Sequence, residues 1–131
     1  MKTQFMKSLT TYINEGLRLG KGSRFNYHPK TKRELQDLIE QLIKERGNEG
    51  NFNDIDTTQI TNMSYLFFDM DNFNGDISKW NVSNVESMAQ MFRGCKSFNQ
   101  NISNWDVSKV TDIDFMFDYC SIEEKYKPKF K

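Results

Sequence analysis

A stretch of about 25 residues occurs three times in succession, and this repeat limits the fold more than any other feature of the chain. Residues 73–98 nearly reproduce themselves when moved forward by 25 positions, and a fainter copy lies the same distance before them. The matched pairs include Phe73 with Phe98, Trp80 with Trp105, Val85 with Val110, Met91 with Met116, Phe92 with Phe117, and Cys95 with Cys120. A fixed period of this length indicates stacked units that bury their apolar faces only against their neighbours.

Each repeat, at roughly 49–72, 73–97 and 98–122, divides into two halves. The first half, as in residues 76–80, alternates polar and apolar side chains and predicts a short strand. The second half opens with Ser83 and Glu86, which form a capping-box pattern before a helix. The apolar positions that follow predict that short helix: Val85, Met88, Met91 and Phe92. We therefore predict an α/β fold, a short right-handed β-α solenoid of about three leucine-rich-repeat-like coils.

Two further helices are expected before the repeats. Residues 4–19 carry apolar side chains at helical spacing and predict an amphipathic helix. Thr31 and Glu34 form a second capping box, a stripe of Leu and Ile follows, and Gly47 ends the segment. This second helix is expected to cap the first coil. The predicted organisation is a helix and linker at 1–23, a capping helix at 24–48, the repeats at 49–122 and a basic tail or cap at 123–131.

Composition excludes several classes of function. The chain has 18 basic and 18 acidic side chains, so no overall charge favours nucleic acid or an anionic membrane. The N-terminal segment has no unbroken apolar run and no early cysteine for lipid attachment. We therefore expect no signal peptide and no membrane span, and a location in the cytoplasm or in a virion.

The sequence offers little support for catalysis or for a cofactor. His28 is the only histidine, and one histidine without a cysteine pair makes no strong zinc site. The acidic stretch 69–76 lacks the ligand spacing of a calcium loop, and the next repeat has lost its carboxylates. Cys95 and Cys120 occupy the same position of successive repeats, which we call the same phase. Equivalent positions allow a disulfide, although packed helices lie farther apart than a disulfide spans. We expect reduced thiols, no metal, no cofactor and no enzymatic activity.

The repeat resembles a known family. Residues 75–99, GDISKWNVSNVESMAQMFRGCKSFN, and 100–120, QNISNWDVSKVTDIDFMFDYC, are similar to the BspA-type leucine-rich-repeat-like surface-protein repeat, also found in mycoplasma lipoproteins. The first copy departs from the pattern, with Ile55 and Met70 in place of Trp and Cys. The resemblance implies a non-catalytic binding or adhesion module. Residues 8–20, SLTTYINEGLRLG, also resemble leading helices of proteins from large tailed phages.

These observations favour a protein-binding solenoid, which would bind a protein partner or a second copy of itself. The expected contacts are exposed positions on the strand face: Lys79, Asn81, Asn84, Asn104, Asp106 and Lys109. The N-terminal helix either packs on the repeats or docks on a partner through its apolar face: Phe5, Leu9, Tyr12, Ile13 and Leu17. The alternatives are an assembly component of a phage virion, a fragment of a bacterial surface adhesin and, last, an enzyme with a borrowed pocket.

Overall fold

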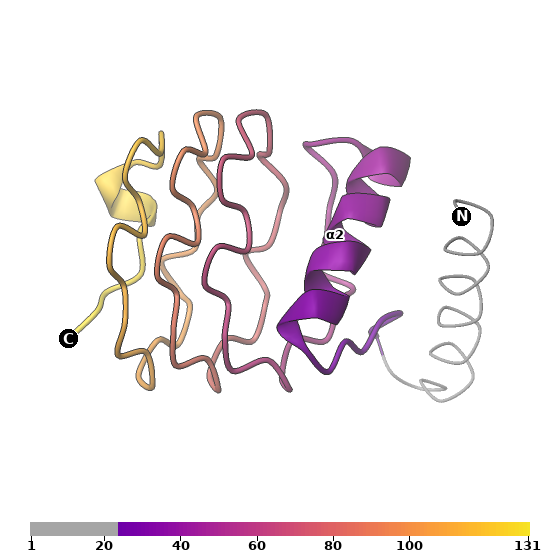
Figure 1. The fold of residues 1–131 in the computed structure, drawn as a ribbon, viewed down its shortest axis with the longest axis horizontal. Helices are drawn as coiled ribbons and strands as arrows, with labels where there is room; N and C mark the ends of the chain where they lie inside the picture. The colour runs from indigo at the N-terminus through magenta and orange to yellow at the C-terminus, as the bar shows by residue number, and fades with distance from the viewer. Residues whose placement is uncertain (1–23) are drawn as a thin grey trace.

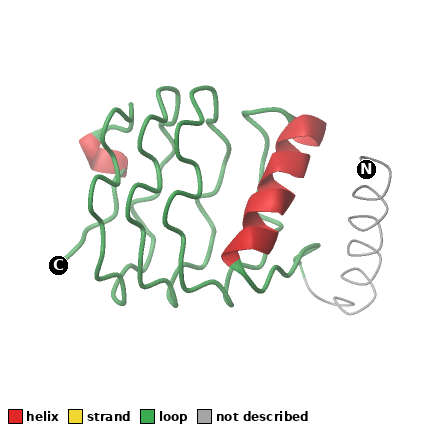
Figure 2. Ribbon diagram, in the orientation of Figure 1, coloured by secondary structure: helices red, strands yellow, loops and turns green. Residues whose placement is uncertain are grey.

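The computed structural model describes residues 24–131, and in them a helix stands at each end of a stack of turns (Figure 1). Helix α2 spans Lys32–Arg46, and the short 3-10 helix η1 spans Glu124–Tyr126. Three coils lie between them, which we number first, second and third at 49–72, 73–97 and 98–122 (Figure 2). The predicted helix at 4–19 and its apolar face lie outside the described residues.

Helix α2 forms where its capping box predicts it. The Glu34 amide donates to the Thr31 hydroxyl over 3.1 Å, and the Glu34 carboxylate accepts from the amide of Lys30 over 3.2 Å. Gly47 follows the helix at φ +83°, and its N–H donates to the carbonyl of Ile43 over 2.7 Å. The helix buries its apolar stripe, which consists of Leu35, Leu38, Ile39 and Leu42. This face covers the first coil, so α2 closes that end of the stack (Figure 1).

The predicted β-α solenoid is wrong, because residues 49–122 contain neither a strand nor a helix. The described residues hold only isolated parallel bridges, which pair Tyr27 with Ile55, Asn51 with Asp76, Asn62 with Ser87, and Ser87 with Asp112. In place of the strand expected at 76–80, the Asp76 carboxylate accepts from the amide and the hydroxyl of Ser78, and the Trp80 amide donates to Ile77. These local bonds fold the segment into turns rather than an extended strand.

The predicted helix after Ser83 is also wrong. The Ser83 hydroxyl does not cap a helix, since it donates to the Asn81 carboxamide over 2.6 Å. Further on, amides bond carbonyls three residues back, with Met91 donating to Met88 and Cys95 to Phe92. Left-handed residues at φ +56° and +77°, Gln90 and Gly94, interrupt the series. The segment is therefore a run of turns, and its apolar spacing of three follows those turns rather than a helical face.

Backbone hydrogen bonds join the coils, and in the second half of the first and second coils a row of four amides donates to the coil that follows. In the first coil the donors are the amides of Met63, Tyr65, Phe67 and Asp69, and the acceptors in the second coil are the carbonyls of Ser87, Ala89, Met91 and Arg93. The second coil repeats the pattern, donating from Met88, Gln90, Phe92 and Gly94 to Asp112, Asp114, Met116 and Asp118 of the third. Along this row, N–H groups face the C-terminal end of the stack and the carbonyls between them face the N-terminal end, while the flanking carbonyls of Glu86 and Cys95 accept from the third coil.

The core is a column of stacked aromatic rings. Phe92 lies between Phe67 and Phe117, with ring centroids 5.3 and 5.7 Å away and planes within 7° of parallel. The two tryptophans are fixed by their ring nitrogens: Trp80 donates to the carbonyl of Phe52 over 2.9 Å, and Trp105 repeats this contact one coil later. The same side chains that mark the repeat in the sequence therefore hold neighbouring coils together.

The C-terminal residues fold back on the third coil. The carbonyl of Tyr126 accepts from the amide of Ile102 over 3.0 Å, and Pro128 is buried. Ile122 is also buried, while Phe130 packs on the edge of the core. The expected tail at 123–131 thus covers part of the third coil.

Candidate protein-interaction surface

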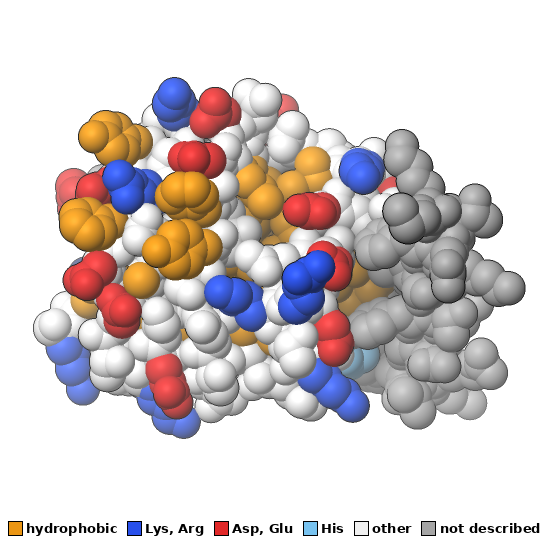
Figure 3. All heavy atoms as spheres, viewed as in Figure 1, with side chains coloured by type: hydrophobic (Ala, Val, Ile, Leu, Met, Phe, Trp, Pro, Cys, Tyr) orange, Lys and Arg blue, Asp and Glu red, His pale blue; other side chains and the backbone are white. Residues whose placement is uncertain are grey.

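Aromatic side chains project into solvent from one half of the first and third coils. They come from Tyr65, Phe68, Phe115 and Tyr119, which are 46%, 39%, 58% and 75% exposed. We call these four residues, with Gln90 and Arg93 of the second coil between them, the aromatic face. Hydrophobic side chains gather with acidic and basic ones over the coils in the space-filling view (Figure 3). Tyr, Phe and Arg together are the residues that protein interfaces favour.

Two polar side chains of the second coil connect the aromatic rings. Gln90 donates from Nε2 to the hydroxyl of Tyr65 over 2.7 Å, and Arg93 donates from Nη1 to Oε1 of Gln90 over 3.0 Å. The guanidinium carbon of Arg93 also lies 5.6 Å from the ring centroid of Phe115 and 6.0 Å from that of Tyr119. Contacts of this kind between a cation and a ring hold side chains in place at exposed sites. These contacts therefore connect Tyr65 of the first coil with Phe115 and Tyr119 of the third.

The backbone turns these side chains outward. Tyr65, Gln90 and Phe115 occupy the same phase of successive coils, and all have φ between +55° and +61°. Tyr119 has φ +57°, at the phase that Gly94 occupies in the second coil. Left-handed backbone is unfavourable for residues other than glycine and persists where surrounding contacts impose it. The peptide groups around this phase bond to neighbouring coils in all three copies: the amides of Tyr65 and Gln90 donate to the next coil, and the carbonyls of Asp114 and Met116, on either side of Phe115, accept from the second coil.

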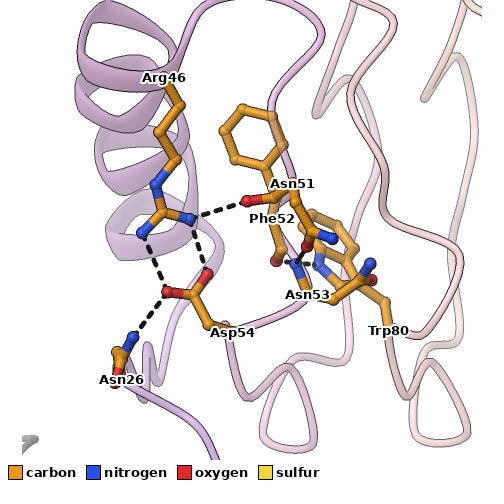
Figure 4. Close-up of polar contacts among 7 residues, drawn as sticks. All are labelled: Asn26, Arg46, Asn51, Phe52, Asn53, Asp54 and Trp80. Carbon is orange, nitrogen blue, oxygen red and sulfur yellow. Dashed lines mark hydrogen bonds and ion pairs between the residues drawn. The ribbon is translucent and has the colours of Figure 1, made fainter.

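A second polar cluster serves the fold rather than a partner (Figure 4). Asp54 accepts from Nη1 and Nη2 of Arg46 over 2.8 and 2.9 Å and from Nδ2 of Asn26 over 2.9 Å. Burial raises the pKa of Asp54, but the hydrogen bonds from Arg46 and Asn26 and the guanidinium charge outweigh it, so the pKa lies below its usual value. Arg46 also donates to the carbonyl of Asn51 over 2.8 Å. The cluster joins α2 to the first coil.

The residues predicted to bind a partner lie in turns, not on a strand face. Lys79, Asn81, Asn104, Asp106 and Lys109 are exposed, and Asn84 is half-buried. Several of them serve the stack itself: Asn84 donates from Nδ2 to the carbonyl of Thr58 over 2.7 Å and accepts from Lys109 over 3.2 Å. The structure brings the six together, because Lys79 shares a phase with Asn104, Asn81 with Asp106, and Asn84 with Lys109. Their role in binding stays a prediction.

The other reactive side chains sit in structural positions. Nδ1 of His28 lies 3.1 Å from Oδ2 of Asp56, which joins the segment before α2 to the first coil. Cys95 and Cys120 have free thiols, and burial raises the pKa of Cys95 to about 12. Within residues 24–131, no group of three or more His, Cys, Asp or Glu could hold a metal ion. In the same part of the chain, no helix is long and apolar enough to cross a membrane.

Residues 35–127 match the family described as Mycoplasma protein of unknown function, DUF285. The chain belongs to this family. The matched region runs from α2 through all three coils to the residue after η1, so the DUF285 unit includes its cap and its C-terminal closure. No curated protein and no solved structure matched the chain.

Sequence reasoning missed the aromatic face, although a signal for it was present. Tyr65 and Phe115 have Gln90 at their phase in the second coil, and Phe68 has Arg93. A phase that accepts glutamine or arginine in the middle coil indicates a position outside the core, because long polar side chains are rarely buried without partners. The exchange of aromatic for polar residues at these two phases therefore indicates an outward-facing surface.

Proposed function

We propose that this DUF285 chain is a non-catalytic protein-binding module that contacts its partner through the aromatic face. The observation that supports this most is the ordered arrangement of Tyr65, Phe115 and Tyr119 around Gln90 and Arg93, with aromatic rings exposed rather than buried. Exposed aromatic side chains held by neighbours contribute large contact area at low entropic cost, which is typical of binding hot spots. The resemblance to the BspA-type repeat supports the same role.

Two other roles rest on sequence resemblance alone. They are an assembly component of a phage virion, from the phage-like segment at 8–20, and a fragment of a surface adhesin, from the BspA-type repeat. For the protein-binding module, we propose a location in the cytoplasm or in a virion. No contact among residues 24–131 supports either alternative over simple protein binding.

The proposal is tested with a displayed peptide library selected on the immobilised full chain. Binders are then measured against the variant Tyr65→Asn/Tyr119→Asn, because asparagine tolerates the left-handed backbone at both positions and should preserve the fold. The matched control is Lys79→Ala/Lys109→Ala, which removes two exposed side chains of the binding site predicted from the sequence. We expect the aromatic variant to lose about tenfold or more in affinity, as hot-spot removal does, and the control to change little.

The opposite result would overturn the proposal. If the selected peptides bind the aromatic variant as tightly as the natural chain, the aromatic face is not the binding surface. If the control variant alone loses binding, the turns that carry Lys79 and Lys109 become the site. Circular dichroism and thermal unfolding of both variants ensure that a loss of binding is not a loss of fold.

A further inference from the structure

The third coil ends the stack with a row of backbone donors that no described residue accepts. By the pattern of the first two coils, the donors would be the amides of Ile113, Phe115, Phe117 and Tyr119. None of these four N–H groups has a hydrogen-bond partner within residues 24–131, whereas their counterparts in the second coil all donate to the third. The edge therefore offers hydrogen-bond donors in a row, like the free edge of a sheet.

This edge differs from the edge of a sheet because donors predominate along the row itself, and the carbonyls of Thr111 and Cys120 flank the row at its two ends. The carbonyls of Ile113, Phe115 and Phe117 already accept from amides three residues further on, at Met116, Asp118 and Cys120. A regular β-strand offers N–H and C=O groups alternately along one edge, so half of its groups would meet other donors here. A second copy of the same row would bring mainly donors. The edge therefore selects a ligand that supplies acceptors, and rows of N–H groups of this kind favour anions.

The opposite end of the stack shows how such a row is satisfied. There the first coil presents carbonyls, and Nζ of Lys32 in α2 donates to the carbonyl of Ser64 over 3.2 Å and to its hydroxyl over 3.3 Å. A positive side chain thus meets the acceptor end of the stack. By the same electrostatics, a carboxylate is the group that fits the donor end.

A groove beside the donor row supplies both apolar and positive contacts. Its volume is about 530 Å³, and its coil side includes Ile113, Phe115 and Phe117. Its tail side carries Lys125, Lys127 and Lys129, against two carboxylates in the lining, Asp118 and Glu124. Nζ of Lys127 already pairs with Glu124 over 2.6 Å and that of Lys125 with Glu123 over 3.8 Å, while Lys129 has no ion pair among the described residues. The lining thus has a net positive charge of one, from three lysines and two acids.

We propose that the donor row and this groove form a docking site for an acidic peptide segment of a protein partner. Carboxylates and carbonyls of the peptide accept from the four amides, its apolar side chains contact the coil side of the groove, and the tail lysines attract its remaining charge. The site is continuous with the aromatic face through Phe115 and Tyr119, whose N–H groups lie in the row and whose rings lie on that face. The inference rests on the proposed function, since it names the class of partner and how it is held.

The first test needs no ligand. In the ¹⁵N-labelled full chain, amide hydrogens of Ile113, Phe115, Phe117 and Tyr119 should exchange faster than those at the same phases of the second coil: Met88, Gln90, Phe92 and Gly94. Equal protection of the two sets would mean that the row is already satisfied, and the proposal would fall.

The second test titrates the same chain at low salt with acetyl-(Glu-Val)₄-amide. We expect downfield shifts and slower exchange at the four amides, and binding about tenfold weaker for the neutral isostere acetyl-(Gln-Val)₄-amide, because hydrogen bonds to a charged acceptor are stronger. Lys129→Glu should weaken binding about threefold or more, as for an exposed charge pair, while the control Lys79→Glu should not.

Each contrary outcome has a separate meaning. Equal binding of the glutamine peptide, or shifts confined to other amides, would overturn the docking site. If monomeric glutamate or inorganic phosphate produces the same shifts at the same concentration, the row binds any small anion and the peptide proposal fails. If these titrations fail while Tyr65→Asn/Tyr119→Asn still weakens library binders, the proposed function stands without the acidic partner.

Discussion

Replacing Phe92 by alanine tests whether the ring column is the main source of stability. Phe92 is fully buried, stacks on Phe67 at 5.3 Å and Phe117 at 5.7 Å, and packs against Phe98 at 4.4 Å. Truncation of a buried phenylalanine costs about 3–5 kcal/mol. Each lost pair of rings adds to area burial by about 0.5–1.5 kcal/mol, so the expected cost lies near the upper end, at about 4–5 kcal/mol. That is a large part of the total stability of a domain of this size.

The matched control is Phe117→Ala, at the end of the same column. Phe117 is half-buried, stacks on Phe92 alone, and lines the open groove on its other side. We expect a loss of about 1–2 kcal/mol, because less apolar area leaves water and one ring contact is lost. Urea unfolding followed by tryptophan fluorescence measures both variants, provided that the slope of free energy against urea is unchanged. If the two variants lose equal stability, the number of ring contacts that a phenylalanine makes in the column does not determine its contribution to stability.

Three further predictions address the polar contacts of the core. Trp80→Phe should lower the free energy of unfolding by about 1–3 kcal/mol, since it leaves the buried carbonyl of Phe52 without its donor; an unchanged urea midpoint would contradict this. The pKa of Asp54 in the folded chain lies below its unfolded value, so its pair with Arg46 stabilises the fold above about pH 4, and this stabilisation is lost as the pH falls through the folded pKa. Asp54→Asn should therefore reduce the loss of stability on the acid side of a pH–stability profile. An equally steep loss in the variant would refute this role of Asp54. The Cys95 thiol, with its pKa raised to about 12 by burial, should react with a disulfide reagent only in denaturant, and rapid modification of the native chain at that position would show that it is accessible.

Helix α2 could be predicted because its signals are local. The Thr31 cap, the apolar stripe and the terminal Gly47 act within a few residues of one another, and no distant contact competes with them. The repeat period was equally visible, since the rings of Phe67, Phe92 and Phe117 must coincide for neighbouring units to stack.

The conformation inside each repeat could not be predicted from hydrophobic spacing, although the turns have a signal of their own. An Asp or Asn followed two residues later by Ser or Thr recurs in the coils, and the side-chain oxygen accepts from that later amide; the residues that accept are Asp56, Asn62, Asp76, Asn81, Asn101 and Asp106. This local bond competes with strand and helix alike. The pattern Ser83–Glu86 therefore resembled a capping box only because its serine belongs to such a turn.

The left-handed residues were beyond sequence reasoning for a different reason. Tyr65 and Phe115 are poor candidates for positive φ on intrinsic grounds, and they adopt it where neighbouring coils hold the chain: the Tyr65 amide donates to the second coil, and the carbonyls on either side of Phe115 accept from it. Their exposure follows from that conformation. The candidate surface thus depends on the stacked assembly and not on any single repeat.

The two proposed contact areas, the aromatic face and the donor row, meet at Phe115 and Tyr119. Their contributions to the binding free energy of one partner can therefore be tested together. Each residue presents a ring on the aromatic face and, in the donor row, an N–H that no residue of 24–131 accepts. If one partner segment uses both, then Tyr119→Asn and Lys129→Glu should not act independently on its binding. A double-mutant cycle with a selected acidic binder should give a coupling of about 0.5 kcal/mol or more, as found for groups that share one ligand. Strict additivity would separate the two areas, leaving the aromatic face to bind without help from the open end of the stack.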